Sequence, residues 1–86
     1  MIKIIGDEIP APTSTGTGTS VGNATMVRCF NSGGTDRLIT VQLADNTRIG
    51  RFTLRQYTVE YVDKNITDEI YGSTATALFS SVIVMG

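Results

Sequence analysis

Apolar and polar residues alternate along several short stretches of this chain. In residues 37–44 the side chains of Ile39, Val41 and Leu43 fall on one face of an extended segment, and polar or smaller side chains fall largely on the other. As an extended segment, residues 24–30 would place Thr25, Val27 and Cys29 on one face and Met26, Arg28 and Phe30 on the other. A two-residue period is typical of a half-buried β-strand, whereas a helix requires a period near 3.6. Both stretches are therefore predicted to be strands.

Further β-prone stretches extend over much of the chain. They are residues 2–5, 48–54, 57–62 and the uncharged, increasingly apolar segment 74–85. Residues 45–47 are Asp, Asn and Thr, whose side chains bond to nearby backbone groups, so the flanking strands are predicted to form a hairpin. Gly50 is predicted to mark a β-bulge. The polar residues 31–36 and 63–68 are predicted to be turns, the second with at most one helical turn.

The segment from residue 6 to 23 has a different composition. Twelve of its 18 residues are Gly, Pro, Ser or Thr. Pro10 and Pro12 favour extended backbone in the residues before them, and no hydrophobic periodicity follows. We therefore expect residues 1–23 to form an N-terminal strand and a flexible arm, and residues 24–86 to form the folded domain.

The number and spacing of the strands predict the fold class. Short strands recur every 8–12 residues with polar turns between them, a pattern typical of antiparallel sheets. The 86 residues suffice for one domain, and thirteen of them are threonine, which favours strands. We predict an all-β fold: a small antiparallel β-sandwich or barrel of about six strands with an extended N-terminal arm.

Composition argues against several classes of function. The chain has no His and one Cys, so hydrolase triads, zinc sites and internal disulfides are not expected. A net charge of −1 does not favour nucleic-acid binding. The sequence has neither an apolar run of membrane-spanning length nor the apolar stretch of a signal peptide. We expect a soluble, unprocessed protein that is not an enzyme and uses no cofactor.

Possible sites for ions and phosphates match their motifs poorly. Asp63, Asn65 and Thr67 alternate like the first ligands of a calcium loop, but Asp68 occupies the position where the turn requires Gly. Gly16, Gly18 and Gly22 lack the G-x-G-x-x-G spacing of a dinucleotide-binding loop and follow two prolines instead of a strand. The sequence therefore predicts no metal or phosphate site.

Two other residue types that often carry chemistry have simpler interpretations. Cys29 alternates with Val27 on a predicted strand face and has no His to activate it, so we expect a buried apolar side chain. Asp68 and Glu69 are adjacent, so on a strand they would point apart; we expect a solvated turn.

Charge is unevenly divided along the chain. Residues 28–55 hold five arginines against two aspartates, a net +3, and residues 56–86 hold one lysine against four acidic residues, a net −3. Arg is enriched at protein interfaces because its planar fork pairs with carboxylates. The two segments could meet between copies of the chain or face each other within one domain; the sequence leaves both open.

The apolar chain ends suggest surfaces completed by a neighbouring chain. The C-terminal run from Val82 to Met85 is too apolar to lie exposed, so it should be buried or paired with another chain. The candidate assembly interface combines both chain ends with three arginines: Ile2, Ile4, Arg48, Arg51, Arg55, Val82, Ile83 and Val84.

The order of these segments resembles that of small virion proteins of tailed bacteriophages. The matching segments are VGNATMVR at 21–28, ITV at 39–41, GRFTL at 50–54 and YTVEYV at 57–62, then Lys64, Thr67, Asp68 and an apolar final strand. Such proteins are compact β-sandwiches with a loose N-terminal segment, and several are capsid cement or decoration proteins that bind between major capsid subunits. The resemblance covers about residues 20–86 and assigns no individual residue a role.

The resemblance implies a virion protein on the capsid surface, made in the cytoplasm of a bacterial host. Its expected partners are the major capsid protein or other virion proteins, and further copies of itself in a homo-oligomer. One alternative is a neck, tail or baseplate adaptor. Another is a carbohydrate-binding adhesion module, for which Tyr57, Tyr61 and Tyr71 are the candidate contact residues.

Overall fold

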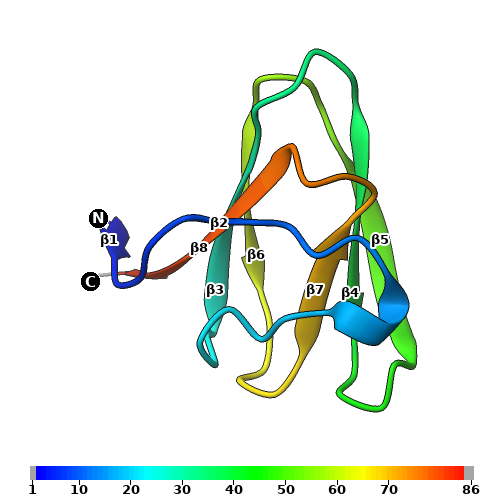
Figure 1. Cartoon of the computed structure of the whole chain (residues 1–86). Coiled ribbons are helices and arrows are strands. Elements are labelled where there is room, and N and C mark those ends of the chain that lie inside the picture. The colour runs from blue at the N-terminus through cyan, green and yellow to red at the C-terminus, as the bar shows by residue number, and fades with distance from the viewer. Residues whose placement is uncertain (1, 85–86) are drawn as a thin grey trace.

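The computed structural model describes residues 2–84, which form a small sandwich of two antiparallel β-sheets (Figure 1). The predicted all-β sandwich is thus confirmed. The elements, in chain order, are β1 (Ile2–Ile4), β2 (Ile9–Pro10), a single 3₁₀ turn η1 (Thr15–Thr17), β3 (Met26–Asn31), β4 (Arg37–Gln42), β5 (Arg48–Leu54), β6 (Val59–Asp63), β7 (Glu69–Gly72) and β8 (Ala77–Val84). Met85, the last residue of the predicted final strand, lies outside the described residues.

β8 lies inside the larger, five-stranded sheet. On one side it pairs with β3, which in turn pairs with β6; on the other side it pairs with β1 and β2 at successive points along its length. The smaller sheet has the order β5-β4-β7. Figure 1 shows the larger sheet on the left of the molecule and the smaller sheet on the right.

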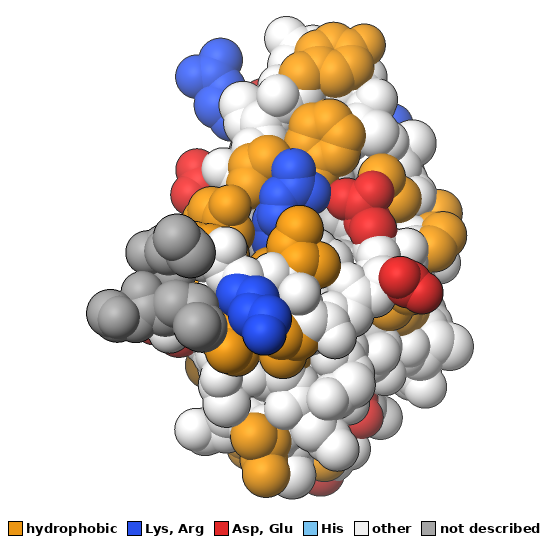
Figure 2. Space-filling model, turned by 90° about the vertical axis from the view of Figure 1, so that its left-hand side faces the viewer, with side chains coloured by type: hydrophobic (Ala, Val, Ile, Leu, Met, Phe, Trp, Pro, Cys, Tyr) orange, Lys and Arg blue, Asp and Glu red, His pale blue; other side chains and the backbone are white. Residues whose placement is uncertain are grey.

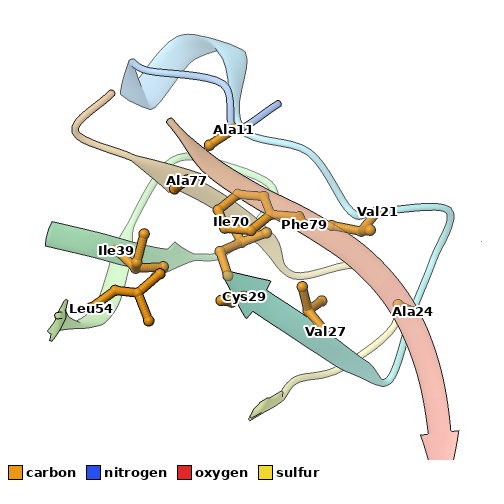
Figure 3. Packing of buried hydrophobic residues seen from close by; sticks show 10 residues of the cluster. All are labelled: Ala11, Val21, Ala24, Val27, Cys29, Ile39, Leu54, Ile70, Ala77 and Phe79. Atoms are coloured by element: carbon orange, nitrogen blue, oxygen red, sulfur yellow. The ribbon is translucent and has the colours of Figure 1, made fainter. Parts of the chain in front are cut away.

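The core lies between the two sheets and follows from the alternation read in the sequence. β3 buries Val27 and Cys29, which belong to the same core cluster as Ile39 of β4 and Leu54 of β5 (Figure 3). Phe79 of β8 is the largest of the fully buried side chains. The buried apolar cluster comprises Ala11, Val21, Ala24, Val27, Cys29, Ile39, Leu54, Ile70, Ala77 and Phe79.

A buried amide links the two sheets at one end of β3. The Asn31 side chain donates hydrogen bonds to the carbonyl oxygens of Thr35 (2.8 Å) and Leu54 (3.1 Å), and its oxygen accepts one from the Gly33 N–H (3.0 Å). Because a buried amide is costly unless it is hydrogen-bonded, these contacts stabilise the turn between β3 and β4.

The segment from residue 6 to 23 runs along the sandwich and contributes to its core. Ala11 and Val21 are buried, and the Ala11 N–H donates to the Ala77 carbonyl oxygen at 2.8 Å. Thr19 forms an antiparallel bridge with Ile70 of β7. The segment therefore contacts both β8 and β7, although its few apolar residues gave no periodic signal. Its predicted flexibility stays a prediction.

Several strand boundaries differ from those expected. β7 was not predicted, because its pairing with β4 combines residues far apart in the sequence. β6 begins at Val59 instead of residue 57, since Tyr57 has a φ of 56° and lies in the turn after β5. The hairpin at 45–47 is present, and the register between β4 and β5 shifts beside Gly50, as expected of a bulge.

A substitution at Gly72 tests how closely the segment 6–23 packs against the two sheets. A Cβ atom at Gly72 would lie 3.2 Å from Ala11 Cβ, 3.3 Å from Ala77 Cβ and 3.3 Å from Ile39 Cδ1. Overpacking of this kind costs about 1–3 kcal/mol, so Gly72→Ala should lower the free energy of unfolding by that amount. The matched control is Gly50→Ala, whose new Cβ meets nothing within 4 Å. Equal urea midpoints for the two variants would contradict this packing.

Candidate assembly surfaces

The two ends of the described chain lie side by side. β1 pairs with the end of β8, matching Ile2 with Val84 and Ile4 with Val82. β3 pairs with β8 only as far as Val82, so Ile83 and Val84 extend beyond it with β1 as a two-stranded projection, visible at the left of Figure 1. We call Ile2, Ile4, Ile83 and Val84 the terminal extension.

The terminal extension exposes apolar side chains. Ile4 is 63% exposed and Val84 57%, while Ile83 is half-buried. Val82 belongs to the candidate assembly interface predicted from the sequence, but its side chain is fully buried. It therefore packs within the domain and is not part of the exposed apolar surface. Exposed apolar groups gathered at one place are typical of an interaction surface.

The side chains on the outer face of the larger sheet form rows across its strands. In one row Ile4, Val82 and Met26 are cross-strand partners, and in another Pro10, Leu78 and Phe30 are. We call the following residues the outer face: Ile4, Pro10, Met26, Arg28, Phe30, Val59, Tyr61, Asp63, Leu78, Ser80 and Val82. Figure 2 looks onto this side of the molecule and shows hydrophobic side chains spread over it, with basic side chains among them.

An ion pair lies between the two apolar rows of the outer face. Arg28 Nη1 lies 3.0 Å from Glu8 Oε2, and the guanidinium carbon lies 5.7 Å from the centre of the Phe30 ring. Ser80 is the β8 partner of Arg28 and is almost fully buried. A partly exposed pair contributes only about 0–1 kcal/mol to stability, so its position matters more than its strength. Sequence reasoning missed this pair because its members are 20 residues apart.

The candidate arginines lie on the other sheet. Arg51 pairs across β5 and β4 with Thr40, which in turn pairs with Tyr71 of β7, so these side chains share the outer side of the smaller sheet. Arg48 lies at the start of β5, and Arg55 follows its last residue. Figure 1 shows β1 and β5 on opposite sides of the molecule. The structure therefore separates the predicted interface into an apolar part and a basic part.

A shallow hollow of about 140 Å³ lies beside Arg51. It is lined by Leu38, Thr40, Arg51, Tyr71 and Ser73. The Tyr71 hydroxyl is hydrogen-bonded to the Thr15 hydroxyl at 3.1 Å. That bond, followed by one from Thr40 and by the positive charges of Arg51 and Arg48, lowers the pKa of Tyr71. The hollow can offer hydroxyl groups and positive charge to a polar group of a partner.

The three tyrosines do not form one aromatic platform. Tyr57 lies in the turn after β5 and is exposed, Tyr61 lies on the outer face of the larger sheet, and Tyr71 lies on the smaller sheet. Tyr57 and Tyr61 therefore do not belong to one strand, although the β-prone stretch 57–62 contains both. The physical reason is the positive φ of Tyr57, which ends the extended backbone there.

The turn between β6 and β7 is built around buried charge. Lys64 Nζ donates to the carbonyl oxygens of Ala24 (2.7 Å) and Asn65 (3.2 Å), and Asp68 Oδ2 accepts from the Asn65 N–H (3.1 Å). Burial lowers the pKa of Lys64, and the nearby Asp68 opposes this shift. The expectation of a solvated turn at Asp68 and Glu69 is wrong: Asp68 is buried, and Glu69 begins β7.

The remaining candidate residues have structural roles. Gly18 lies against the side chains of Gln42 and Glu69, and a neighbouring carboxylate does not suit a phosphate site. Within residues 2–84, no group of three or more His, Cys, Asp or Glu side chains could hold a metal ion. In the same part of the chain, no helix has the length and apolar character required to cross a membrane.

Comparisons with known proteins give no relatives. No family model, no curated protein and no solved structure matches the chain.

Cys29 provides a test of the core beneath the outer face. Its side chain is fully buried, as expected, and burial, aided by the charge of Glu60, raises the pKa of the thiol to about 12. Because the thiolate is the reactive form, native protein should react with a thiol reagent at about pH 8 far more slowly than protein in denaturant. Labelling at the same rate in both conditions would contradict this placement.

Proposed function

We propose that this chain is a non-enzymatic structural protein of a bacteriophage virion, a capsid cement or decoration protein that reinforces contacts between capsid subunits. The observation that carries the proposal is the terminal extension: two paired chain ends that project from the sandwich with Ile2, Ile4 and Val84 exposed. Such an extension suits the edge or groove of a neighbouring subunit. The order of strand segments that resembles phage virion proteins gives the partner class.

The extension can engage a partner through its backbone as well as its side chains. β1 is the last strand of its sheet on that side, so an added strand could pair with it by β-augmentation. In that mode main-chain hydrogen bonds supply affinity, and alternate side chains such as Ile2 and Ile4 supply register. Lys3 lies between them and would favour an acidic partner residue nearby.

Reinforcement follows from mass action. A protein that binds the assembled shell but not its free subunits stabilises the shell by RT ln(1 + [L]/Kd) at each site. The stabilisation free energies from many bound copies therefore add up, even when each copy binds weakly. The basic side of the smaller sheet, with Arg48, Arg51 and Arg55, is available for a second contact with an acidic capsid surface.

Cosedimentation with capsids tests the proposal. The purified chain should pellet with expanded capsids of the phage whose genome carries its gene, and it should raise the temperature at which those capsids disrupt. Binding only to tail or baseplate assemblies would contradict the capsid role and indicate an adaptor function. Binding to a panel of surface glycans but not to capsids would replace the proposal with an adhesion function.

The variant Ile83→Asp tests the terminal extension itself. Ile83 lies beyond the end of β3 and does not belong to the buried apolar cluster, so a charge there should block docking and leave the core intact. We expect capsid occupancy to fall at least about tenfold, a loss of about 1.4 kcal/mol or more. The matched control is Ile66→Asp, an exposed isoleucine in the turn between β6 and β7.

The thermal transition of each variant shows whether it is folded. A folded Ile83→Asp protein that coats capsids as fully as wild type would exclude the extension from the interface.

A further inference from the structure

The two outer sides of the sandwich differ in character. The outer side of the smaller sheet carries mostly polar groups, among them Thr40, Gln42, Arg51 and Glu69, beside the exposed Leu38. The outer face of the larger sheet presents apolar rows on both sides of the ion pair of Arg28 with Glu8. Antiparallel sheets with one side in water typically carry polar residues on that side. The outer face of the larger sheet therefore has the residue composition of a surface that is buried against another layer.

We infer that the outer face is the interface between two copies of this chain, related by a two-fold axis that runs along β8. The argument rests on the register of the strands on either side of β8. Val82 has Ile4 on one side and Met26 on the other; Leu78 has Pro10 on one side and Phe30 on the other.

A two-fold rotation about β8 exchanges these two sides. Ile4 of one copy then faces Met26 of the second copy, and Pro10 faces Phe30 of the second copy. In both cases an apolar side chain meets an apolar side chain. Leu78 lies near the axis and meets its own counterpart, as an isologous interface requires. Val82 is already covered by its neighbours, so the flanking rows make the contact at its level.

The same rotation makes the charges complementary. Glu8 and Arg28 lie on opposite sides of Ser80, because Arg28 is the β3 partner of Ser80 and Glu8 immediately precedes β2. In the dimer Glu8 of each copy faces Arg28 of the other. The four charges alternate around the axis, so each arginine contacts two carboxylates. Pairing of this kind gives an interface specificity and register.

The size of the face is adequate for a stable dimer. The molecule measures 32 × 31 × 19 Å along its principal axes, and the outer face follows the eight residues of β8 and includes the strands on both sides of it. A specific interface buries about 800 Å² on each partner, which a face of this breadth can supply. Sheets stacked face to face with nearly aligned strands also form an ordinary packing arrangement. Asp63 and the exposed Tyr61, on β6, lie at the rim of the paired faces.

Charge-reversal variants distinguish an ion pair between two copies from the ion pair within one chain. Wild-type protein in sedimentation equilibrium should be a dimer that dissociates in the micromolar range. Arg28→Glu alone leaves only negative charge at the axis, and Glu8→Arg alone leaves only positive charge. Each should weaken self-association at least about tenfold.

An equimolar mixture of the two variants is the decisive sample. The glutamate introduced at position 28 of one chain then faces the arginine introduced at position 8 of the other. The native Glu8 of the first chain faces the native Arg28 of the second, so heterodimers should form at nearly wild-type affinity. The control Arg51→Glu reverses a charge on the smaller sheet and should leave the dimer unchanged. Ile4→Arg, at a mostly exposed position, is a second variant expected to dissociate the dimer without unfolding the chain.

Three results would overturn the inference: wild-type protein that stays monomeric, single reversals that dimerise like wild type, or a mixture that stays monomeric. Capsid binding is measured separately. A monomeric wild type that binds capsids would contradict the dimer and leave the proposed function intact, whereas a dimer that binds no capsid would do the reverse.

Discussion

The pairing of β8 on both sides is the constraint on which the rest of this structure depends. β8 lies against β3 along one edge and against β1 and β2 along the other. Its inward residues Ala77 and Phe79 enter the core, while its outward residues Leu78, Ser80 and Val82 form the middle of the outer face. Because the side-chain period of a strand is two, a shift of one residue would exchange the two sets. One register therefore determines both the core and the exposed surface.

This arrangement explains why β1 and the end of β8 together form a surface. β8 is longer than β3, and its last residues find a partner only in β1. In the part of the chain that the structure describes, β1 packs mainly against β8, and Ile2, Ile4 and Val84 stay partly or largely exposed. For a domain of 86 residues, whose own core is small, surface of this kind is well suited to burial against other chains. The proposed capsid contact centres on the projecting end of β8 and the free edge of β1, and the proposed dimer centres on the middle of β8.

The sequence predicts local structure well and the assembly of the sheets poorly. Alternation identified the strands around Val27, Ile39 and Phe52, because period two is a local signal. The bridge of Thr19 to Ile70 and the ion pair of Glu8 with Arg28 depend on sheet order, which no local pattern encodes. For the same reason the candidate set joined Arg48, Arg51 and Arg55 to the chain ends, although β5 belongs to the other sheet.

Native-state hydrogen exchange tests the central role of β8 most directly. Backbone amides paired inside a sheet open only with larger unfolding events, whereas those of edge strands open locally. The amides of β8 from Ala77 to Val82 should therefore exchange as slowly as those of β3, the other interior strand of this sheet, and at least about tenfold more slowly than those of β5 and β6 at the sheet edges. Exchange of β8 at the same rate as these edge strands would contradict the account.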